Sequence, residues 1–220
     1  MNFAPVVKFL PFLLSGVATT LLVSALSFLL GMTIGLILAL FRLSSVAPLR
    51  WAASLYIDFF RSTPVLIQII WLFFVLPIVT GIYLDAIPIG ILALGLNLGA
   101  FAAEIYRSGI LAVPTGQREA ALSQGMTGLQ AMRRVILPQA VRMVLPAIAS
   151  AMISLVLDSS LVSVINVPEL MSKANTVAGF TIRPLEVWSL VALIYLVLTM
   201  PLAVAVNKLQ KRALSVVGGR

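Results

Sequence analysis

A single carboxylate stands in the middle of an apolar run in the last third of the chain. Asp158 occurs in LVLDSSLVSVIN, residues 155–166, with Ser154 one helical turn before it and Ser159 and Ser160 directly after it. An ionised carboxylate near the centre of a bilayer costs at least about 2.5 kcal/mol, so Asp158 must face a water-filled cavity or a partner group. A carboxylate among hydroxyls suits the α-ammonium group of a solute. The serines or another helix can also hold it as a structural group, and the sequence leaves both roles open.

A second group of polar side chains lies in the third apolar run. Asn97, Phe101 and Glu104 share one face of a helix by their spacing. Arg107 follows Glu104 by three residues, which is suitable spacing for an ion pair within one helix, so we favour a structural role for Glu104. Asn97 lies deeper in the run and is a weaker candidate for the translocation path.

Polar residues also open the second apolar run, where Thr63 and Gln68 follow Arg61. The guanidinium of Arg61 can bind a solute carboxylate, but its expected position at the inner end of a span favours a role in topology. The residues predicted to line the substrate path are Asp158, Ser159, Ser160, Ser154, Asn97, Gln68, Thr63 and Glu104.

The composition argues against catalysis by this chain. It has no cysteine, no histidine and only seven carboxylates, which leaves little for metal binding or general acid–base chemistry. An integral membrane enzyme is therefore the least favoured of the possible functions. The chain also lacks a Gly-x4-Gly-Lys-Ser/Thr phosphate loop, so it cannot hydrolyse ATP in that manner. We expect no catalytic residue, no metal and no cofactor in this chain.

The elements that must position these residues are membrane helices. Of 220 residues, 61% are hydrophobic, and the mean hydropathy is +1.12, so the solvent is mostly lipid. Five apolar runs are long enough to cross about 30 Å of hydrocarbon. The sequence therefore predicts a single all-α integral membrane domain over residues 1–220. Its spans are expected at about 12–41, 53–80, 86–109, 143–165 and 187–207.

The distribution of positive charge indicates the orientation. With the N-terminus outside and the C-terminus in the cytoplasm, twelve of the fifteen Lys and Arg residues lie on the inner side. The three on the outer side are Lys8, Lys173 and Arg183. The net charge of +8 is thus a topology signal, and no nucleic-acid partner is expected. Within the spans, Gly31 and Gly35, and likewise Gly95 and Gly99, have the spacing that lets two helix backbones approach closely.

The segment at about 110–140 then lies in the cytoplasm, between the third and fourth spans. Residues 117–124 are good helix formers and end at Gly125, which suits a left-handed helix end. Thr127 or Thr115 is suited to cap an adjoining helix start, and LQAMRRVIL predicts a second short helix that stops or kinks near Pro138. Such an element can dock into a groove of a partner or rest on anionic lipid, and the physics weighs the two equally.

The order of residues in this segment resembles the EAA loop of permeases of ATP-binding-cassette (ABC) importers. The matching positions are Glu119, Ala120, Ala121, Gly125, Val135, Leu137 and Pro138, with valine where the family has isoleucine. YIDFFRSTPVLIQI at 56–69 looks like the polar amino-acid permease subfamily, with Ser62 for the usual glycine. LDSSLVSVINVPEL at 157–170 does too, with Leu157 where many relatives have lysine. The likeness covers most of residues 20–170.

The resemblance implies that the seven matching positions couple the chain to a cytoplasmic ATP-binding subunit, present in two copies, which binds ATP and Mg. The other implied partners are a second permease copy or a paralogue, an extracytoplasmic solute-binding protein and the bacterial cytoplasmic (inner) membrane. The expected function is the permease subunit of an importer for a polar amino acid or related small solute. The alternative is an ATP-independent secondary transporter or channel, which the lack of an internal repeat disfavours. The solute itself and the choice between homodimer and heterodimer stay open.

Overall fold

The computed structural model describes residues 3–217, with side chains through residue 208, and every regular element in that part of the chain is helical. The long helices are α2 (Leu10–Arg42), α3 (Ala47–Ser62), α6 (Ala86–Leu111), α9 (Leu137–Asp158) and α11 (Pro184–Val217). Shorter α-helices are α1 (Ala4–Val7), α4 (Val65–Ile70), α5 (Leu76–Thr80), α7 (Thr115–Ser123), α8 (Gly128–Ala131) and α10 (Leu170–Thr181). Two π-helical turns, η1 (Trp71–Val75) and η2 (Met132–Ile136), and one 3-10 helix, η3 (Ser159–Ile165), complete the order.

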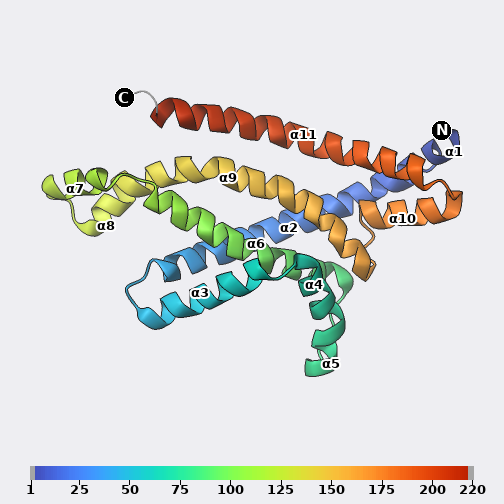
Figure 1. Cartoon of the computed structure of the whole chain (residues 1–220), viewed down its shortest axis with the longest axis horizontal. Coiled ribbons are helices and arrows are strands. Elements are labelled where there is room, and N and C mark those ends of the chain that lie inside the picture. Colours follow the sequence, from blue (N-terminus) through green and yellow to red (C-terminus); the bar gives the residue numbers. More distant parts are fainter. Residues whose placement is uncertain (1–2, 218–220) are drawn as a thin grey trace.

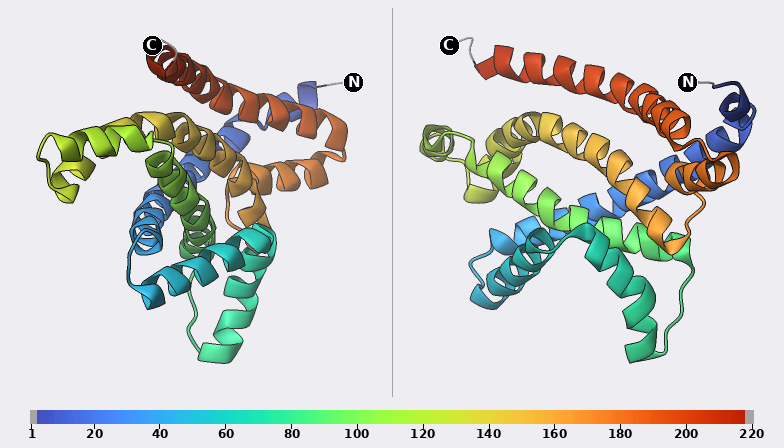
Figure 2. Two further views of the ribbon diagram at one scale, coloured as in Figure 1. Left: turned by 60° about the vertical axis from the view of Figure 1, so that its left-hand side comes forward. Right: turned by 45° about the vertical axis from the view of Figure 1, so that its right-hand side comes forward.

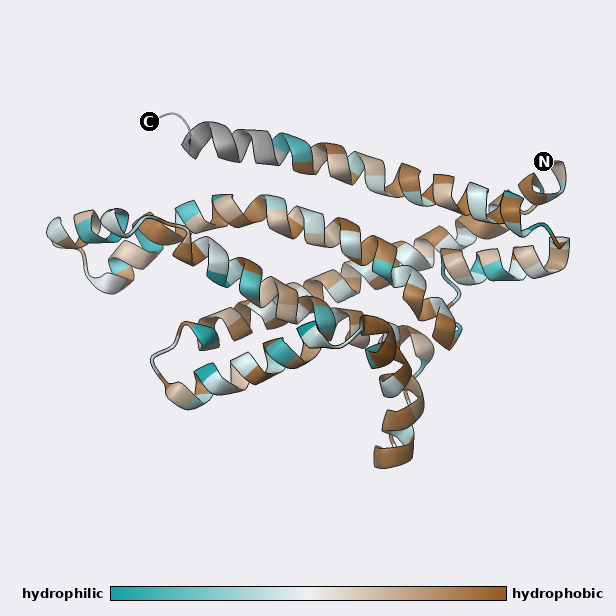
Figure 3. Ribbon diagram, in the orientation of Figure 1, coloured by the Kyte–Doolittle hydropathy of each residue, from teal (hydrophilic) through white to brown (hydrophobic). Residues whose placement is uncertain are grey.

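The long helices run along one axis of the molecule, and the N- and C-terminal ends of the chain lie at opposite ends of it (Figures 1 and 2). Four helical stretches are long and apolar enough to cross a membrane, and a bent helix pair brings the number to five within the described residues. The expected spans 12–41, 86–109 and 187–207 each lie inside one of these stretches. Hydrophobic residues predominate along these helices (Figure 3), and many of the large ones are exposed, as a lipid solvent requires.

The glycine pairs lie where α2 and α6 pack together in parallel, and their spacing predicted such a close approach. A Cβ on Gly35 would lie 2.5 Å from the Ala102 side chain and 3.0 Å from the Gly99 carbonyl, and one on Gly99 would lie 2.8 Å from Ile34. Any larger side chain at these positions would push the helices apart. The prediction of close helix approach is therefore confirmed, and α6 is held at a fixed height against α2.

The span expected at 53–80 is not one continuous helix, which corrects the prediction. The chain breaks between α3 and α4, and the two halves of this broken span differ in direction by 103°. Thr63 and Pro64 adopt extended backbone, since a residue before proline disfavours the helical region and proline itself donates no hydrogen bond. The half after the break, α4 to α5, leaves the axis of the other helices almost at right angles (Figures 1 and 2). We call this break the elbow, residues 60–68.

The span expected at 143–165 belongs to a longer helical stretch, Gly128–Ile165. The preceding short helix was expected to stop or kink near Pro138, and the structure shows that it does not stop there. Instead, the π-turn η2 comes directly before the Leu137–Pro138 pair, and η1 stands in the same relation to Leu76 and Pro77. A wider turn removes the clash between a proline ring and the carbonyl four residues earlier, so both prolines are accommodated without a break.

Candidate functional site

The loop between α6 and α9 forms a helix–turn–helix at the end of the molecule opposite the N-terminus (Figure 1). Helix α7 ends in a Schellman motif, in which Met126 N–H donates to Ala121 O at 3.2 Å and Gly125 N–H donates to Leu122 O at 2.9 Å. Gly125 carries a φ of +81°, so a side chain at this position would strain the turn. The predicted helix, glycine turn and helix are therefore confirmed.

Helix α8 begins with a capping box, in which Thr127 Oγ1 accepts from Gln130 N–H at 3.3 Å and the Gln130 side chain accepts from Thr127 N–H at 2.9 Å. Thr127 is thus the cap that the sequence suggested, whereas Thr115 is already the first residue of α7. Both helix ends of the turn are satisfied within the loop itself. The loop is consequently a preformed knob, which we call the coupling loop, residues 112–138.

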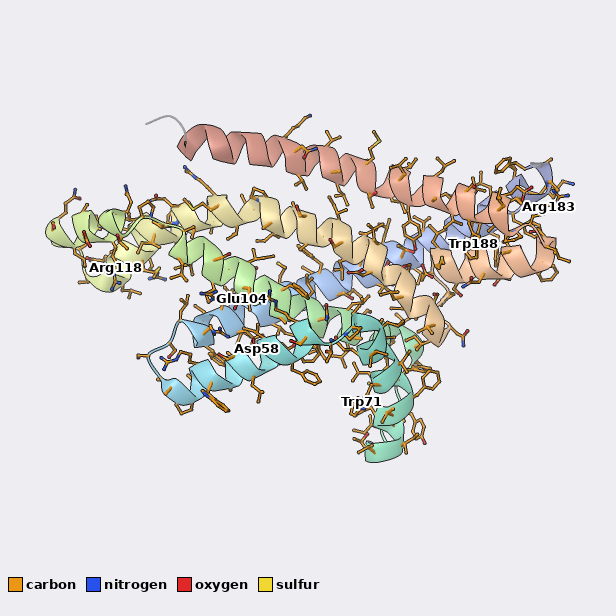
Figure 4. All side chains as sticks on the ribbon, in the orientation of Figure 1. Asp58, Trp71, Glu104, Arg118, Arg183 and Trp188 are labelled. Atoms are coloured by element: carbon orange, nitrogen blue, oxygen red, sulfur yellow. The ribbon has the colours of Figure 1, made fainter. Side chains whose placement is uncertain are left out.

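The positions that match the EAA loop lie on the surface of this knob, in its core and on its stem. Glu119 and Ala120 are exposed on α7, near the labelled Arg118 in Figure 4, while Ala121 is 4% exposed and packs inward. The remaining positions lie on the stem that joins the knob to α9: Val135 in η2, and Leu137 and Pro138 at the start of α9.

Side-chain contacts connect the knob to the membrane helices. Gln139 Nε2 donates to Val135 O at 2.9 Å and reaches Gln117 Oε1 on α7 at 3.5 Å. Beneath it, Val113, Ile136 and Ala140 form a small buried cluster. Because η2 and α9 are continuous, one helical stretch joins the knob to Asp158, the last residue of α9.

That last residue lines a cavity of about 230 Å³ between α6 and α9. The polar members of its lining are Asn97, Ser154 and Asp158, and the others are Leu94, Leu98, Phe101, Ile105, Ala151 and Leu155. Ser154 and Asp158 lie one turn apart on the same face of α9. Within the described residues, no hydrogen bond or ion pair is present at the Asp158 carboxylate. An anionic group without a partner beside a cavity is available to a cationic ligand.

The other predicted path residues do not line this cavity. Ser159 is fully buried, and its hydroxyl donates to Val156 O at 2.7 Å. Ser160 lines a second, open cavity of about 410 Å³ between η3 and α11. Thr63 and Gln68 belong to the elbow, where their polar groups bond to each other and to backbone carbonyls.

Glu104 pairs with Arg107, as expected, at 2.8 Å between Oε2 and Nη2 (Figure 4 labels Glu104 on α6). Arg61 is not at the inner end of a helix but at the elbow, with its guanidinium 5.5 Å from the centre of the Phe101 ring. Phe101 lines the cavity, but Arg61 is exposed and is not itself part of the cavity lining.

The sequence analysis assigned no role to Glu169, which is fully buried just before α10. Its carboxylate accepts from Met171 N–H at 2.8 Å, Ser172 N–H at 2.7 Å and the Tyr195 hydroxyl at 3.2 Å. The Thr20 hydroxyl of α2 lies at 3.5 Å. We call this group the outer junction, since it ties α2, α10 and α11 together. A carboxylate directly before a helix start was the available signal, because such a residue can cap the helix.

Comparison with known proteins gives the family. Residues 31–215 match the family of the binding-protein-dependent transport system inner membrane component. A probable amino-acid ABC transporter permease of Bacillus subtilis, YckA, is 40% identical, with 92% of this chain and 89% of the relative covered. The L-cystine transport system permease TcyB of the same organism is also 40% identical, with 93% and 88% covered.

A solved structure agrees with these relatives. The crystal structure of an amino acid ABC transporter with histidines superposes with a TM-score of 0.92 at 37% identity, covering 96% of this chain and 99% of the other. The five-span helical architecture and the coupling loop thus occur in a chain that belongs to the binding-protein-dependent transport system inner membrane component family, the multi-pass membrane permeases of ABC importers.

Proposed function

We propose that this chain is the permease subunit of an ATP-driven importer of a polar amino acid or a related small solute in the bacterial cytoplasmic membrane. The N-terminus lies outside, and the coupling loop and the C-terminus lie in the cytoplasm. The partners are two copies of an ATP-binding subunit, which bind ATP and Mg, a second permease copy or paralogue, and an external solute-binding protein. The relatives that are named for amino acids support the solute class.

The single observation that carries this proposal is the preformed coupling loop at one end of a helix whose other end carries Asp158. A knob that is rigid without a partner loses little conformational entropy when it docks, so it can pass a movement of the ATP-binding subunit to α9. Glu119, Ala120 and Gly125 form the surface of the knob, and Ala121 supports it from inside.

The cavity supports the proposed solute class through its charges. Asp158 and Ser154 provide acceptors for an ammonium or guanidinium group, and Arg61, over the ring of the lining residue Phe101, provides a cation for a carboxylate. Together they suit a small solute with charges of both signs. Glu104 is occupied by Arg107 and is assigned no contact with solute.

The test is to replace Gly125 by valine and to measure uptake and ATP hydrolysis in proteoliposomes that contain the whole complex. No atom lies near the Cβ position, so the substitution acts through backbone strain alone. We expect normal insertion, continued ATP hydrolysis and uptake reduced at least tenfold, since a misplacement of about an ångström suffices for a loss of that size.

Gly179→Ala is the matched control, because it lies in α10, at the opposite end of the molecule, and a Cβ there also meets no atom. It should leave uptake within a factor of about two. Normal ATP-driven uptake by Gly125→Val would contradict the coupling role. Uptake by the permease alone, driven by an ion gradient, would instead establish a secondary transporter.

A further inference from the structure

The elbow leaves backbone carbonyls without their helical donors in the middle of the protein. Pro64 has no N–H to donate to the carbonyl of Phe60, and the extended backbone of Thr63 and Pro64 ends the helical hydrogen bonds of α3. In a membrane-spanning region such groups must be satisfied by other protein groups, because lipid offers none.

Two side-chain amides supply these donors. Gln68 Nε2 lies 3.1 Å from Phe60 O, 3.1 Å from Thr63 O and 2.7 Å from Thr63 Oγ1. Asn97 Nδ2, from α6, donates to Phe60 O at 3.0 Å and to Gln68 Oε1 at 3.2 Å. Gln68 is 7% exposed and is not part of the cavity lining, whereas Asn97 is.

These contacts fix which atom each amide turns toward the elbow. Backbone carbonyls only accept, so the nitrogen of Gln68 must face Phe60 O and Thr63 O, and its oxygen faces Asn97. The nitrogen of Asn97 must likewise face Phe60 O and the Gln68 oxygen. Both hydrogens of the Asn97 amide are therefore used within the elbow, and its oxygen is the polar atom left for the cavity.

We infer that Gln68 is a positioning residue for solute binding: by accepting from Asn97, it holds the Asn97 oxygen as an acceptor in the cavity that Asp158 lines. The inference rests on the proposed function, since it takes this cavity as the solute site. It assigns Gln68, which the sequence placed in the substrate path, to a role through Asn97 instead of direct contact. It also explains why a buried amide stands where the span breaks.

The test is a double-mutant cycle on the purified permease–ATPase complex, with binding of radiolabelled L-arginine, L-glutamine and L-cystine as probes. For the probe that the wild-type complex binds, Gln68→Leu and Asn97→Ala should each weaken binding by about tenfold. This is the loss expected for one hydrogen bond to a charged group. The double variant should bind the probe about as weakly as the single variant with the lower affinity, since both substitutions remove the same acceptor from the cavity.

Two further variants separate positioning from folding. Ile69→Leu changes a fully buried neighbour without touching a hydrogen bond, and it should alter affinity less than about twofold. Thr63→Val removes the 2.7 Å contact to Gln68 and keeps the volume, so it should weaken binding in the wild-type background but not beside Asn97→Ala. This variant keeps the test decisive if Gln68→Leu does not fold.

The outcomes distinguish the inference from the proposal on which it rests. Additive losses of affinity from Gln68→Leu and Asn97→Ala would overturn the positioning role. So would variants that lower the amount of folded complex but leave the affinity of each folded molecule unchanged. Asn97→Ala with wild-type affinity would overturn it too. Failure of all three probes to bind the wild-type complex would instead refute the amino-acid site, and the inference would fall with it.

Discussion

Two carboxylates, separated along the chain by little more than η3, have opposite surroundings. Glu169 at the outer junction is fully buried and receives hydrogen bonds from two backbone N–H groups and two hydroxyls. Asp158 lines the cavity, and in the described part of the chain no donor or cation lies at hydrogen-bonding distance from its carboxylate. One acid therefore completes the fold, whereas the other is the carboxylate that we propose binds the solute.

The largest effect is expected at the carboxylate without a partner. Asp158→Asn removes the charge and keeps the shape, so solute binding should weaken by about tenfold to a hundredfold, the cost of losing a charge-assisted contact. The thermal stability of the complex in detergent should not fall, because no protein contact is lost. Binding within twofold of wild type would show that Asp158 does not meet the solute.

The opposite pattern is expected at the outer junction. Glu169→Ala leaves the N–H groups of Met171 and Ser172 and the Tyr195 hydroxyl without their acceptor, which should destabilise the protein by about 2–4 kcal/mol. Unfolding in detergent measures this loss. Solute affinity of the molecules that remain folded should change little, and a large change in affinity at unaltered stability would break the comparison.

The protonation of Glu169 provides a second test of its structural role. Burial raises the pKa of Glu169 above its ordinary value, and this effect outweighs the hydrogen bonds from Met171, Ser172, Tyr195 and Thr20, which lower it. The folded protein thus holds this proton more tightly than the unfolded chain does. The stability that the protonated Glu169 contributes is fully present below the ordinary pKa. It is lost as the pH rises through the raised pKa of the folded protein.

Glu169→Gln provides the measurement for this dependence, because glutamine has a similar shape and does not titrate. As the pH rises from about 4 upward, the melting temperature of the wild type should fall relative to that of Glu169→Gln. A difference that is constant across this range would show that Glu169 does not change its protonation between the folded and unfolded states.

The smallest effect is expected at the third carboxylate, Glu104. Its partner Arg107 lies one turn away on the same helix, and both side chains keep partial contact with solvent, 21% and 31% exposed. Such a pair contributes only about 0.3–0.5 kcal/mol. Glu104→Gln should therefore change neither uptake nor melting temperature appreciably, and a loss of uptake would bring Glu104 back into the substrate path.

The fold features that depend on local sequence were predictable. The glycine spacing predicted close helix approach but not which helices meet, Gly125 predicted the turn of the coupling loop, and the spacing of Glu104 and Arg107 predicted their ion pair. The turn and the ion pair were predictable because they depend on residues close together in the sequence, and because glycine adopts the left-handed conformation that other residues avoid. The expected spans 12–41, 86–109 and 187–207 each fall inside one long apolar helix, whereas 143–165 is part of the longer stretch Gly128–Ile165 and 53–80 is broken at the elbow.

What was not predictable depends on contacts between distant segments. Hydropathy does not distinguish a straight span from one that breaks at Pro64, and only the contact with Asn97 shows why Gln68 is there. Ser159 and Ser154 look equivalent beside Asp158, yet the change from α9 to η3 buries one and leaves the other at the cavity. Glu169 was missed because its partners Thr20 and Tyr195 are far away in the sequence.

The most direct test of the contrast between the two acids is to measure solute-stimulated ATP hydrolysis and melting temperature together, on the same purified complex, for Asp158→Asn and Glu169→Gln. If the cavity carboxylate binds solute and the junction carboxylate holds the fold, Asp158→Asn loses stimulation at a wild-type melting temperature. Glu169→Gln then keeps stimulation while its melting temperature departs from that of the wild type. The reverse assignment, stimulation lost in Glu169→Gln and retained in Asp158→Asn, would contradict the account.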